Sequence, residues 1–438
     1  MRPNMTTAVH PYIEGLLSGT RELPKSAHPW LDERRGAALE QANALSVPTT
    51  RDEEWRFTDL SSLTRVQLSA AGTPRTVYPA SIEACDVPEA GARLVFVDGV
   101  YAPQLSTTAE DGAAAHVVPL TAALTRDAQR LEPHLAKLAA FKNNVFAALN
   151  TAHLRDGAAV IVPENAACEK AVHLLFIATQ ANTASYPRVL IVAESGSDCT
   201  VIEEYIGLTD DAYLTNAVTE ITVAPTARLR HIKLQRENAR AFHIATCAVD
   251  VAKDASYVSQ TITLGARLSR FDLGVVLNGQ GASAEMDGLA LISARQLADS
   301  HTVIDHAHPH GRSVQLHKTI VDGAAHAVFS GKIHVRPGAQ STDSSQQSRN
   351  LLLSDKATVD TKPQLEIFAD DVKCAHGATV GQLDSEQLFY LTSRGLAERA
   401  ARNLLTYAFG AAVIERIPLR SVVRRLERTV MAQTGAAA

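Results

Sequence analysis

The chain has 438 residues, with 42 Lys and Arg against 47 Asp and Glu and a net charge of -5. This slightly acidic balance argues against a protein that holds nucleic acid on a general basic surface. Hydrophobic residues make up 46% of the chain and charged residues 20%, which excludes disordered and collagen-like proteins. The length allows one large domain or two to three smaller ones.

The cysteine pattern and the N-terminal residues indicate the cellular compartment of the protein. The five cysteines are far apart and form no CxxC pair, unlike a disulfide framework or a structural zinc module. Glu14 and Glu22 fall where a secretory signal would need an apolar run, and no window supplies the roughly 18 uncharged apolar residues of a membrane span. We therefore expect a cytoplasmic protein that binds neither a membrane nor nucleic acid.

Residues 1–154 are expected to form a mixed, largely helical region. Apolar residues recur at helical intervals after Pro29, and a second helical pattern covers 131–154. The segment 51–60, RDEEWRFTDL, is too polar for a core strand and predicts a helical turn at the surface. A strand-like run, RLVFV, begins at Arg93.

Residues 155–383 are expected to form a β-solenoid. Short β-branched and apolar runs recur there, broken by Gly, Asp and Asn. Small residues suited to tight corners return at spacings of 29, 28 and 27 residues, which favours a coil that stacks each strand on the previous turn. The corner segments begin at Asp198, Ala227, Ala255 and Ala282, with later candidates at Ala325, Ala357 and Ala378. A β-sandwich is the alternative, because Asn278-Gly279 and Asp322-Gly323 are typical of hairpin turns.

Residues 384–438 are expected to form three helices. Asp384 followed by Gln387 is typical of a helix N-terminal cap, and Gly395 suits the left-handed residue that ends the first helix. A second helix then runs up to Pro418, which stops it, and a third follows.

The sequence carries none of the common self-contained catalytic motifs. The Gly331-Lys332 pair lacks the glycine and the Ser or Thr of a phosphate-binding loop. A Gly-x-Ser-x-Gly nucleophile elbow and a His-Glu-x-x-His metal helix are also absent. We therefore do not expect an enzyme.

Seven histidines crowd into residues 301–334. On an extended strand His306, His308 and His310 would share one face, and Asp305 could add an oxygen ligand for a metal. We favour the interpretation that these histidines are hydrogen-bonded parts of the solenoid. The set comprises His301, His306, His308, His310, His317, His326 and His334.

Cys374 and His376 form the more specific candidate site. Two residues apart on a strand, they lie on the same face and offer one soft and one borderline metal ligand, and Lys373 could favour the thiolate of the cysteine. A closed metal site or an iron–sulfur cluster needs more donors. Either a partner chain supplies them or the pair is structural.

Five segments of the chain match the pattern of one known family. They are EEWRFTDL within 51–60, residues 141–150, QLHKTIVDGAAHAVF at 315–329, VDTKPQLEIFADDVKCAHGATVG at 359–381, and FYLTSRG with ARNLLTYAF within 389–409. On these segments the chain resembles the SufB/SufD family of scaffold proteins for iron–sulfur cluster assembly, for which DVKCAHGATVG is highly specific. The length and the lack of an N-terminal cysteine cluster resemble the SufD branch more than the SufB branch.

This resemblance implies a mainly β fold, a right-handed parallel β-helix flanked by N-terminal and C-terminal helical parts. It implies a non-catalytic subunit that pairs with SufB and docks the SufC ATPase in a SufBC2D assembly, with a cysteine desulfurase as an indirect partner. Iron or a nascent iron–sulfur cluster would be held transiently at the SufB interface, ATP would be bound only by SufC, and the chain alone would hold no tight cofactor. A homodimer of the isolated chain is left open.

The resemblance also assigns roles to residues. His376 matches a histidine that helps to hold iron or the nascent cluster, and Cys374 matches the neighbouring interface cysteine.

The C-terminal helices are expected to dock SufC. Apolar Leu404, Leu405, Tyr407 and Phe409 belong to a set that covers more of the helix circumference than one intramolecular contact needs. The arginines from Arg416 to Arg428 are expected to form a solvated face.

Two other functions stay open. A SufB-like primary scaffold would carry a cluster without another subunit. A carbohydrate-active β-helix enzyme would need exposed aromatic residues along a groove, whereas aromatic residues are only 5% of the chain and both Trp30 and Trp55 precede the expected coil.

Overall fold

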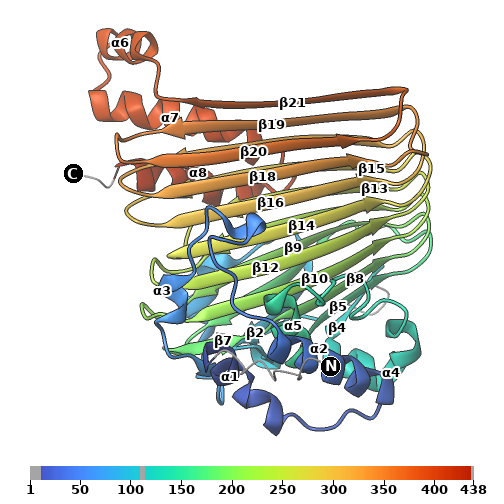
Figure 1. Cartoon of the computed structure of the whole chain (residues 1–438). Coiled ribbons are helices and arrows are strands. Elements are labelled where there is room, and N and C mark those ends of the chain that lie inside the picture. The colour runs from blue at the N-terminus through green and yellow to red at the C-terminus, as the bar shows by residue number, and fades with distance from the viewer. Residues whose placement is uncertain (1–10, 109–113, 436–438) are drawn as a thin grey trace, which may run out of the picture.

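The computed structural model describes residues 11–108 and 114–435, and its main feature is a pair of long β-sheets that face each other (Figure 1). We call the 11-stranded sheet sheet A and the 10-stranded sheet sheet B. From residue 198 onward, successive strands alternate between the two sheets, and each pairs in parallel with the strand one turn earlier. The chain is therefore a parallel β-helix, as predicted. The β-sandwich alternative is wrong, because a sandwich is built from antiparallel strands.

The strands of each sheet follow in chain order. Sheet A comprises β1 (Ser69–Ala70), β4 (His116–Pro119), β5 (Gly157–Val162), β7 (Thr183–Ser185), β8 (Arg188–Ala193), β10 (Leu214–Val223), β12 (Phe242–Val251), β14 (Leu268–Leu277), β16 (Leu297–His306), β18 (His326–Val335) and β20 (Thr358–Ile367). Sheet B comprises β2 (Ala90–Val97), β3 (Val100–Tyr101), β6 (Ala171–Ala178), β9 (Asp198–Gly207), β11 (Arg228–Arg236), β13 (Ser256–Thr263), β15 (Ser283–Ile292), β17 (Arg312–Val321), β19 (Thr342–Leu352) and β21 (Val372–Gly381).

The strand register shows where the predicted corners lie. Asp198, Arg228, Ser256 and Ser283 are register partners on successive turns of sheet B, and the residue before each of the last three is the predicted corner alanine. The first corner is Ser197, one residue earlier than predicted. Ala325 and Ala357 are corners of sheet A rather than sheet B.

Ala378 lies inside β21, so the prediction of a corner there is wrong. Small residues are needed at corners because the chain turns tightly between neighbouring turns. No described strand stacks on β21 from the far side, so Ala378 does not mark the start of another turn.

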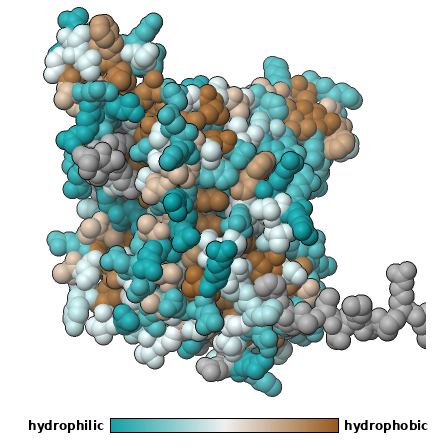
Figure 2. Space-filling model, turned by 60° about the vertical axis from the view of Figure 1, so that its left-hand side comes forward, coloured by the Kyte–Doolittle hydropathy of each residue, from teal (hydrophilic) through white to brown (hydrophobic). Residues whose placement is uncertain are grey.

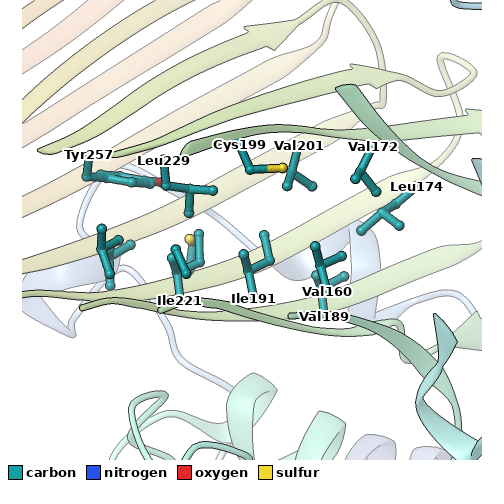
Figure 3. Close-up of a cluster of buried hydrophobic side chains, with 14 of the residues drawn as sticks. Val160, Val172, Leu174, Val189, Ile191, Cys199, Val201, Ile221, Leu229 and Tyr257 are labelled. Carbon is teal, nitrogen blue, oxygen red and sulfur yellow. The ribbon is translucent and has the colours of Figure 1, made fainter. Parts of the chain in front are cut away.

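Apolar side chains fill the space between the sheets. Along each strand, side chains alternate between this interior and the outer face. Figure 3 shows one row of side chains from sheet B, including Val201 and Leu229, above a row from sheet A that includes Ile191 and Ile221. Each such fully buried aliphatic side chain contributes about 1.5–3 kcal/mol relative to an exposed one.

Two of the N-terminal helices, α2 (Pro29–Ala44) and α5 (Val145–Ala152), lie against sheet A. They share a core with Phe242 and Ile244, which point outward from β12. The other elements of this region are α1 (Pro11–Leu17), η1 (Ser18–Glu22), η2 (Glu53–Trp55), α3 (Ser61–Thr64), η3 (Pro79–Cys85), η4 (Pro103–Leu105) and α4 (Leu120–Leu131). β2 and β4, which precede residue 155, already belong to the solenoid sheets.

The helix predicted over 131–154 is wrong in its extent. α4 ends at Leu131 and α5 begins only at Val145, after Asn144. The Asn144 side chain accepts hydrogen bonds from the backbone N–H groups of Phe146 and Ala147, both at 3.0 Å, and so caps the later start.

The C-terminal helices are α6 (Ser385–Ser393), α7 (Glu398–Ile414) and α8 (Arg420–Gly435). Asp384 caps α6 and Gly395 has a φ of +94°, as the sequence predicts. α7 and α8 bury an apolar face, including Val413 and Leu426, against the outer face of sheet B. α6 projects from the corner of the molecule (Figure 1), and Figure 2 shows hydrophobic surface on this projection. Among the described residues, no helix is both long and apolar enough to span a lipid bilayer.

Candidate ligand site at the open end of the solenoid

The solenoid ends in two strands that lack a neighbour on one side. Among the residues that the structure describes, β20 pairs only with β18, and β21 only with β19. Each is ten residues long, so each leaves a row of backbone N–H and C=O groups without a strand partner. We call this the open end. Apolar side chains are exposed beside it, with Phe368 59% and Val380 49% exposed.

Cys374 and His376 lie together on β21 at the open end. Their register partners on β19 are Ser344 and Gln346, whose side chains are buried in the interior. Cys374 and His376 therefore both face the interior side of the last turn, where Cys374 is partly buried and His376 is exposed. Two protein donors are thus presented side by side at a surface that another chain can reach.

The expectation that Lys373 favours a thiolate is wrong. Lys373 pairs in register with Asp343 and points to the opposite face of β21 from Cys374. Burial raises the pKa of Cys374, and the negative charge of Asp343 raises it further. In the isolated chain the thiol form is favoured, and a metal or a partner's cation would be needed to remove the proton.

A column of polar side chains runs inward from this pair. The Ser344 hydroxyl is hydrogen-bonded to that of Ser313 (2.6 Å), which is in turn hydrogen-bonded to His306 Nε2 (2.9 Å). Gln346, only 1% exposed, has no hydrogen-bond partner for either atom of its amide. Thr361 on β20 likewise has a buried hydroxyl without a partner.

These polar interior residues were missed from the sequence. The signal was present, because Thr342, Ser344, Gln346, Ser348 and Asn350 alternate along β19 at the interior positions. A strand with a polar residue at every inward position cannot line an apolar core. It indicates a solenoid turn that serves another purpose.

The histidines of 301–334 occupy separate places. The favoured interpretation fits four of them: His306 is hydrogen-bonded to Ser313, His326 to Asp360 (2.7 Å), His334 to Asp305 (3.2 Å) and His301 to Asp299 (2.9 Å). Burial lowers the pKa of His317, in the interior, to about 3.

The metal alternative depended on three histidines that share one face. β16 ends at His306, whose side chain is buried, whereas His308 and His310 are exposed in the following corner. Over 11–108 and 114–435, no group of three or more His, Cys, Asp or Glu residues could hold a metal ion.

A second candidate site lies between α6 and α7. Phe389, 74% exposed, and Tyr390 on α6 face Leu404 and Leu405 on α7 across an apolar groove of about 1000 Å³. Tyr407 and Phe409 do not line this groove. They pack against the core between α7, α8 and sheet B, where Tyr407 donates a hydrogen bond to Glu427 and the Lys318 ammonium lies 4.7 Å from the Phe409 ring centroid.

Two family models together match almost the whole chain. The SUF system FeS cluster assembly SufBD core domain matches residues 176–409, and the SufBD protein N-terminal region matches residues 7–174. The chain belongs to the SufBD family of the SUF iron–sulfur cluster assembly system. Cys374, His376 and the groove between α6 and α7 all lie within the SufBD core domain.

Similar proteins span nearly the full chain. It is 39% identical over 415 residues to an iron–sulfur cluster assembly SufBD family protein of Synechocystis sp., covering 92% of this chain and 91% of that protein. It is 37% identical over 383 residues to the iron–sulfur cluster assembly protein SufD of Escherichia coli, covering 86% and 87%. It is 30% identical over 423 residues to the chloroplastic protein ABCI7 of Arabidopsis thaliana, covering 93% and 87%.

The SufBD N-terminal segment 51–60 has a structural role that its sequence did not reveal. The Arg270 guanidinium lies 3.8 Å from the Trp55 ring centroid, and the Thr58 hydroxyl donates to Asp299 at 2.5 Å. Arg270 also donates to Asp299 at 2.7 Å. These contacts fasten the segment to the outer face of sheet A.

The prediction of a solvated arginine face is wrong for one residue of this SufBD chain. Arg425 is buried and donates to Glu204 at 2.9 Å, which fastens α8 to sheet B. Arg416 is exposed, as predicted, and also donates to Asp287 at 2.9 Å. Arg420, Arg424 and Arg428 are exposed, as predicted.

Proposed function

We propose that this chain is a non-catalytic scaffold subunit of iron–sulfur cluster assembly. It pairs with a SufB subunit through the open end and docks the SufC ATPase in the groove between α6 and α7. His376 and Cys374 join a ligand set that holds iron or a nascent cluster as cargo. The observation that carries this proposal is the pair of unpartnered strand edges with Cys374 and His376 on the inward face of the last one.

The open end supports pairing with a subunit of the same fold. A long unpaired edge is a template for strand addition, and here two such edges end at the same level of the solenoid. A partner that ends in two edges of its own can extend both sheets at once. Such a contact would also cover the exposed apolar residues Ile367, Phe368 and Val380.

The polar interior supports the ligand role. Two donors do not complete a tetrahedral iron site, so the remaining thiolates or carboxylates come from the partner or from sulfide. The unpaired amide of Gln346 lies in register beneath His376 and can accept from, or donate to, a group that arrives with the partner. In this arrangement the site is complete only at the interface.

The groove supports docking of a separate ATPase. α7 presents one apolar face to sheet B, where Val413 and Ile414 are fully buried, and a second to the groove, where Leu404 is exposed. An apolar face left open in this way suits a partner surface. The chain has no phosphate-binding loop in its sequence, so ATP is used by the partner.

Co-expression with SufB and SufC, followed by native mass spectrometry, tests this proposal. We expect one copy of this chain with one SufB and two SufC. Val380→Glu, at the open end, should lose SufB and keep SufC, whereas Leu404→Glu, in the groove, should lose SufC and keep SufB. Leu208→Glu, at an exposed corner away from both surfaces, and Ala412→Glu, exposed on α7, are the matched controls.

The results for the two variants test the two proposed surfaces independently. If Val380→Glu leaves the SufB stoichiometry unchanged, the open end is not the SufB interface. If Leu404→Glu leaves SufC bound, the groove is not the docking site. If the chain forms only homodimers in the presence of SufB, the scaffold role beside SufB is wrong.

A further inference from the structure

Two cysteines face each other on adjacent turns near the N-terminal end of the solenoid. Ala167, shortly before β6, forms a parallel bridge with Asp198, the first residue of β9. The Cys168 N–H donates to the Asp198 carbonyl at 2.8 Å, and the Asp198 N–H donates to the Ala166 carbonyl at 2.9 Å. This register makes Cys168 and Cys199 the next cross-strand neighbours.

The two side chains point the same way. Cys199 is 1% exposed and belongs to the interior apolar cluster shown in Figure 3, and the partly buried Cys168 packs against the same cluster. The register therefore places the two thiols next to each other, and each shifts the pKa of the other. Cross-strand neighbours are about 4.8 Å apart, within the range of about 4.4–6.8 Å that a disulfide spans between Cα atoms.

The two thiols are not equivalent. The neighbouring Cys199 thiol lowers the pKa of Cys168, which is the more accessible of the pair. The contact with Cys168 raises the pKa of Cys199, and burial raises it further. An accessible, more acidic thiol beside a buried one is the arrangement in which the first attacks an oxidant and the second resolves the product.

We propose that Cys168 and Cys199 form a reversible disulfide when the protein meets a peroxide. The Cys168 thiolate attacks one oxygen of hydrogen peroxide, an S–O bond forms, the O–O bond breaks, and the departing oxygen leaves as water after protonation. Cys199 then attacks the resulting sulfenic acid, an S–S bond forms, and the sulfenic oxygen leaves as a second water with the Cys199 proton. Two thiols are oxidised by two electrons and one peroxide is reduced to two waters.

The product would join consecutive turns of the solenoid. The chain between Cys168 and Cys199 contains β6, β7 and β8, which is one full turn, so the bond closes that turn covalently. This restricts the unfolded chain and leaves the open end untouched. The modification would therefore stabilise the solenoid without involving Cys374 or His376.

Peptide mapping of the full chain tests the proposal. The purified chain is treated with a few equivalents of hydrogen peroxide, alkylated under denaturing conditions and digested without reductant. We expect a peptide that links Cys168 to Cys199, lighter by two hydrogen atoms than its parts, together with two fewer reactive thiols and a higher Tm. Dithiothreitol should reverse all three changes.

Single variants distinguish this pair from general oxidation. Cys199→Ser should leave Cys168 to accumulate as a sulfenic or sulfinic acid, and Cys168→Ser should leave Cys199 reduced because it is buried. Cys247→Ser, which removes another buried interior cysteine, should keep the linked peptide. The proposal is overturned if the parent chain keeps all its thiols, if Cys168 is overoxidised despite Cys199, or if the linked peptide joins other cysteines.

Discussion

The two halves of the solenoid interior differ in kind. From β5 to β15 the interior is lined mainly by apolar side chains, and the buried charges among them are paired, as in Glu203 with His231 (2.8 Å) and Glu237 with His243 (2.7 Å). From β16 to β21 the sheet B side of the interior is polar, because the interior positions of β17 and β19 carry Ser, Thr, Gln, Asn and His, while the facing strand β18 still contributes apolar side chains such as Phe329 and Ile333. Gln346 on β19 has no partner. We call these the closed half and the open half.

This difference indicates which part of the solenoid stabilises the fold and which part serves a contact. A paired charge in an apolar interior costs far less than an unpaired one, and the surrounding apolar area stabilises the fold. A buried amide without a partner costs free energy and is retained only if something else needs it. The closed half therefore supplies more of the apolar stabilisation, and the unpaired amide in the open half supports the contact that we propose there.

The largest expected effect is a loss of function in the open half with no loss of stability. His376→Ala should reduce the iron and sulfide retained by the reconstituted complex with SufB and SufC to background, because in our proposal the exposed imidazole acts as a ligand and does not pack in the core. Its free energy of unfolding should stay within about 0.5 kcal/mol of the parent. Metal analysis of the purified complex checks the expected loss of iron, and urea unfolding of the isolated chain checks the expected stability.

His308→Ala is the matched control for that variant. His308 is also exposed and lies in a corner of the same half of the solenoid. Full retention of iron and sulfide by His376→Ala would refute the ligand role, and an equal loss in both variants would show that the effect is not specific to the open end.

The next effect is a loss of stability in the closed half. Phe176 is 4% exposed, and its ring lies between those of Phe96 and Tyr205 at centroid distances of 5.1 and 4.9 Å. Phe176→Ala should lower the free energy of unfolding by about 3–5 kcal/mol, because it removes a large buried ring and leaves a cavity. The same change at exposed Phe368 in the open half should cost under about 0.5 kcal/mol. Similar losses at the two positions would mean that the halves do not differ in stability.

The sequence predicted most of this architecture because the signals are local. Small residues at Ala227, Ala255 and Ala282 mark corners whatever lies nearby, and Asp384 and Gly395 mark the ends of α6 by backbone chemistry alone. The Cys374-x-His376 pair was also found locally, since residues two apart on a strand share a face.

What the sequence could not predict depends on contacts between distant segments. Arg425 was expected to be solvated because the sequence of α8 does not show which helix face packs against Glu204, which lies 221 positions away in the chain. Gln346 was overlooked because its lack of a partner follows from which strands are stacked above and below it. The unpaired edge of β21 could not be predicted for the same reason, because the sequence of a strand does not show whether another turn follows it.

A pH-dependent effect of intermediate size comes from a buried carboxylate on the outer face of the closed half. Burial alone would raise the pKa of Glu204, but hydrogen bonds and charges from His173, Arg236 and Arg425 hold it at about 2. A folded-state pKa below the unfolded value of 4.5 gives stability that is present above pH 4.5 and lost as the pH falls toward 2. Between pH 6 and pH 3 the parent should lose about 2 kcal/mol more than Glu204→Gln does.

Urea unfolding of the two proteins at both pH values checks this prediction. Glu285→Gln, which removes a surface carboxylate paired with Arg416 on the same sheet, serves as the control and should follow the parent. If Glu204→Gln keeps the parent's full acid dependence, then other carboxylates carry it and Glu204 is not the paired anion of the closed half.

The smallest expected effect is the sharpest test of the comparison, because it changes the same residue type at interior positions of the same sheet. Gln235 in the closed half donates to Glu237 at 3.0 Å and accepts from the Gly265 N–H at 3.2 Å, so Gln235→Leu should cost the isolated chain about 1–3 kcal/mol by leaving both partners unsatisfied. Gln346→Leu removes an amide that has no partner, so the free energy of unfolding should be unchanged or should rise by up to about 1 kcal/mol. If the amide is needed at the interface, Gln346→Leu should in addition weaken the complex with SufB while leaving the isolated chain intact. An equal cost for the two substitutions in the isolated chain would show that Gln346 is already satisfied there, and the open half would then be an ordinary part of the core.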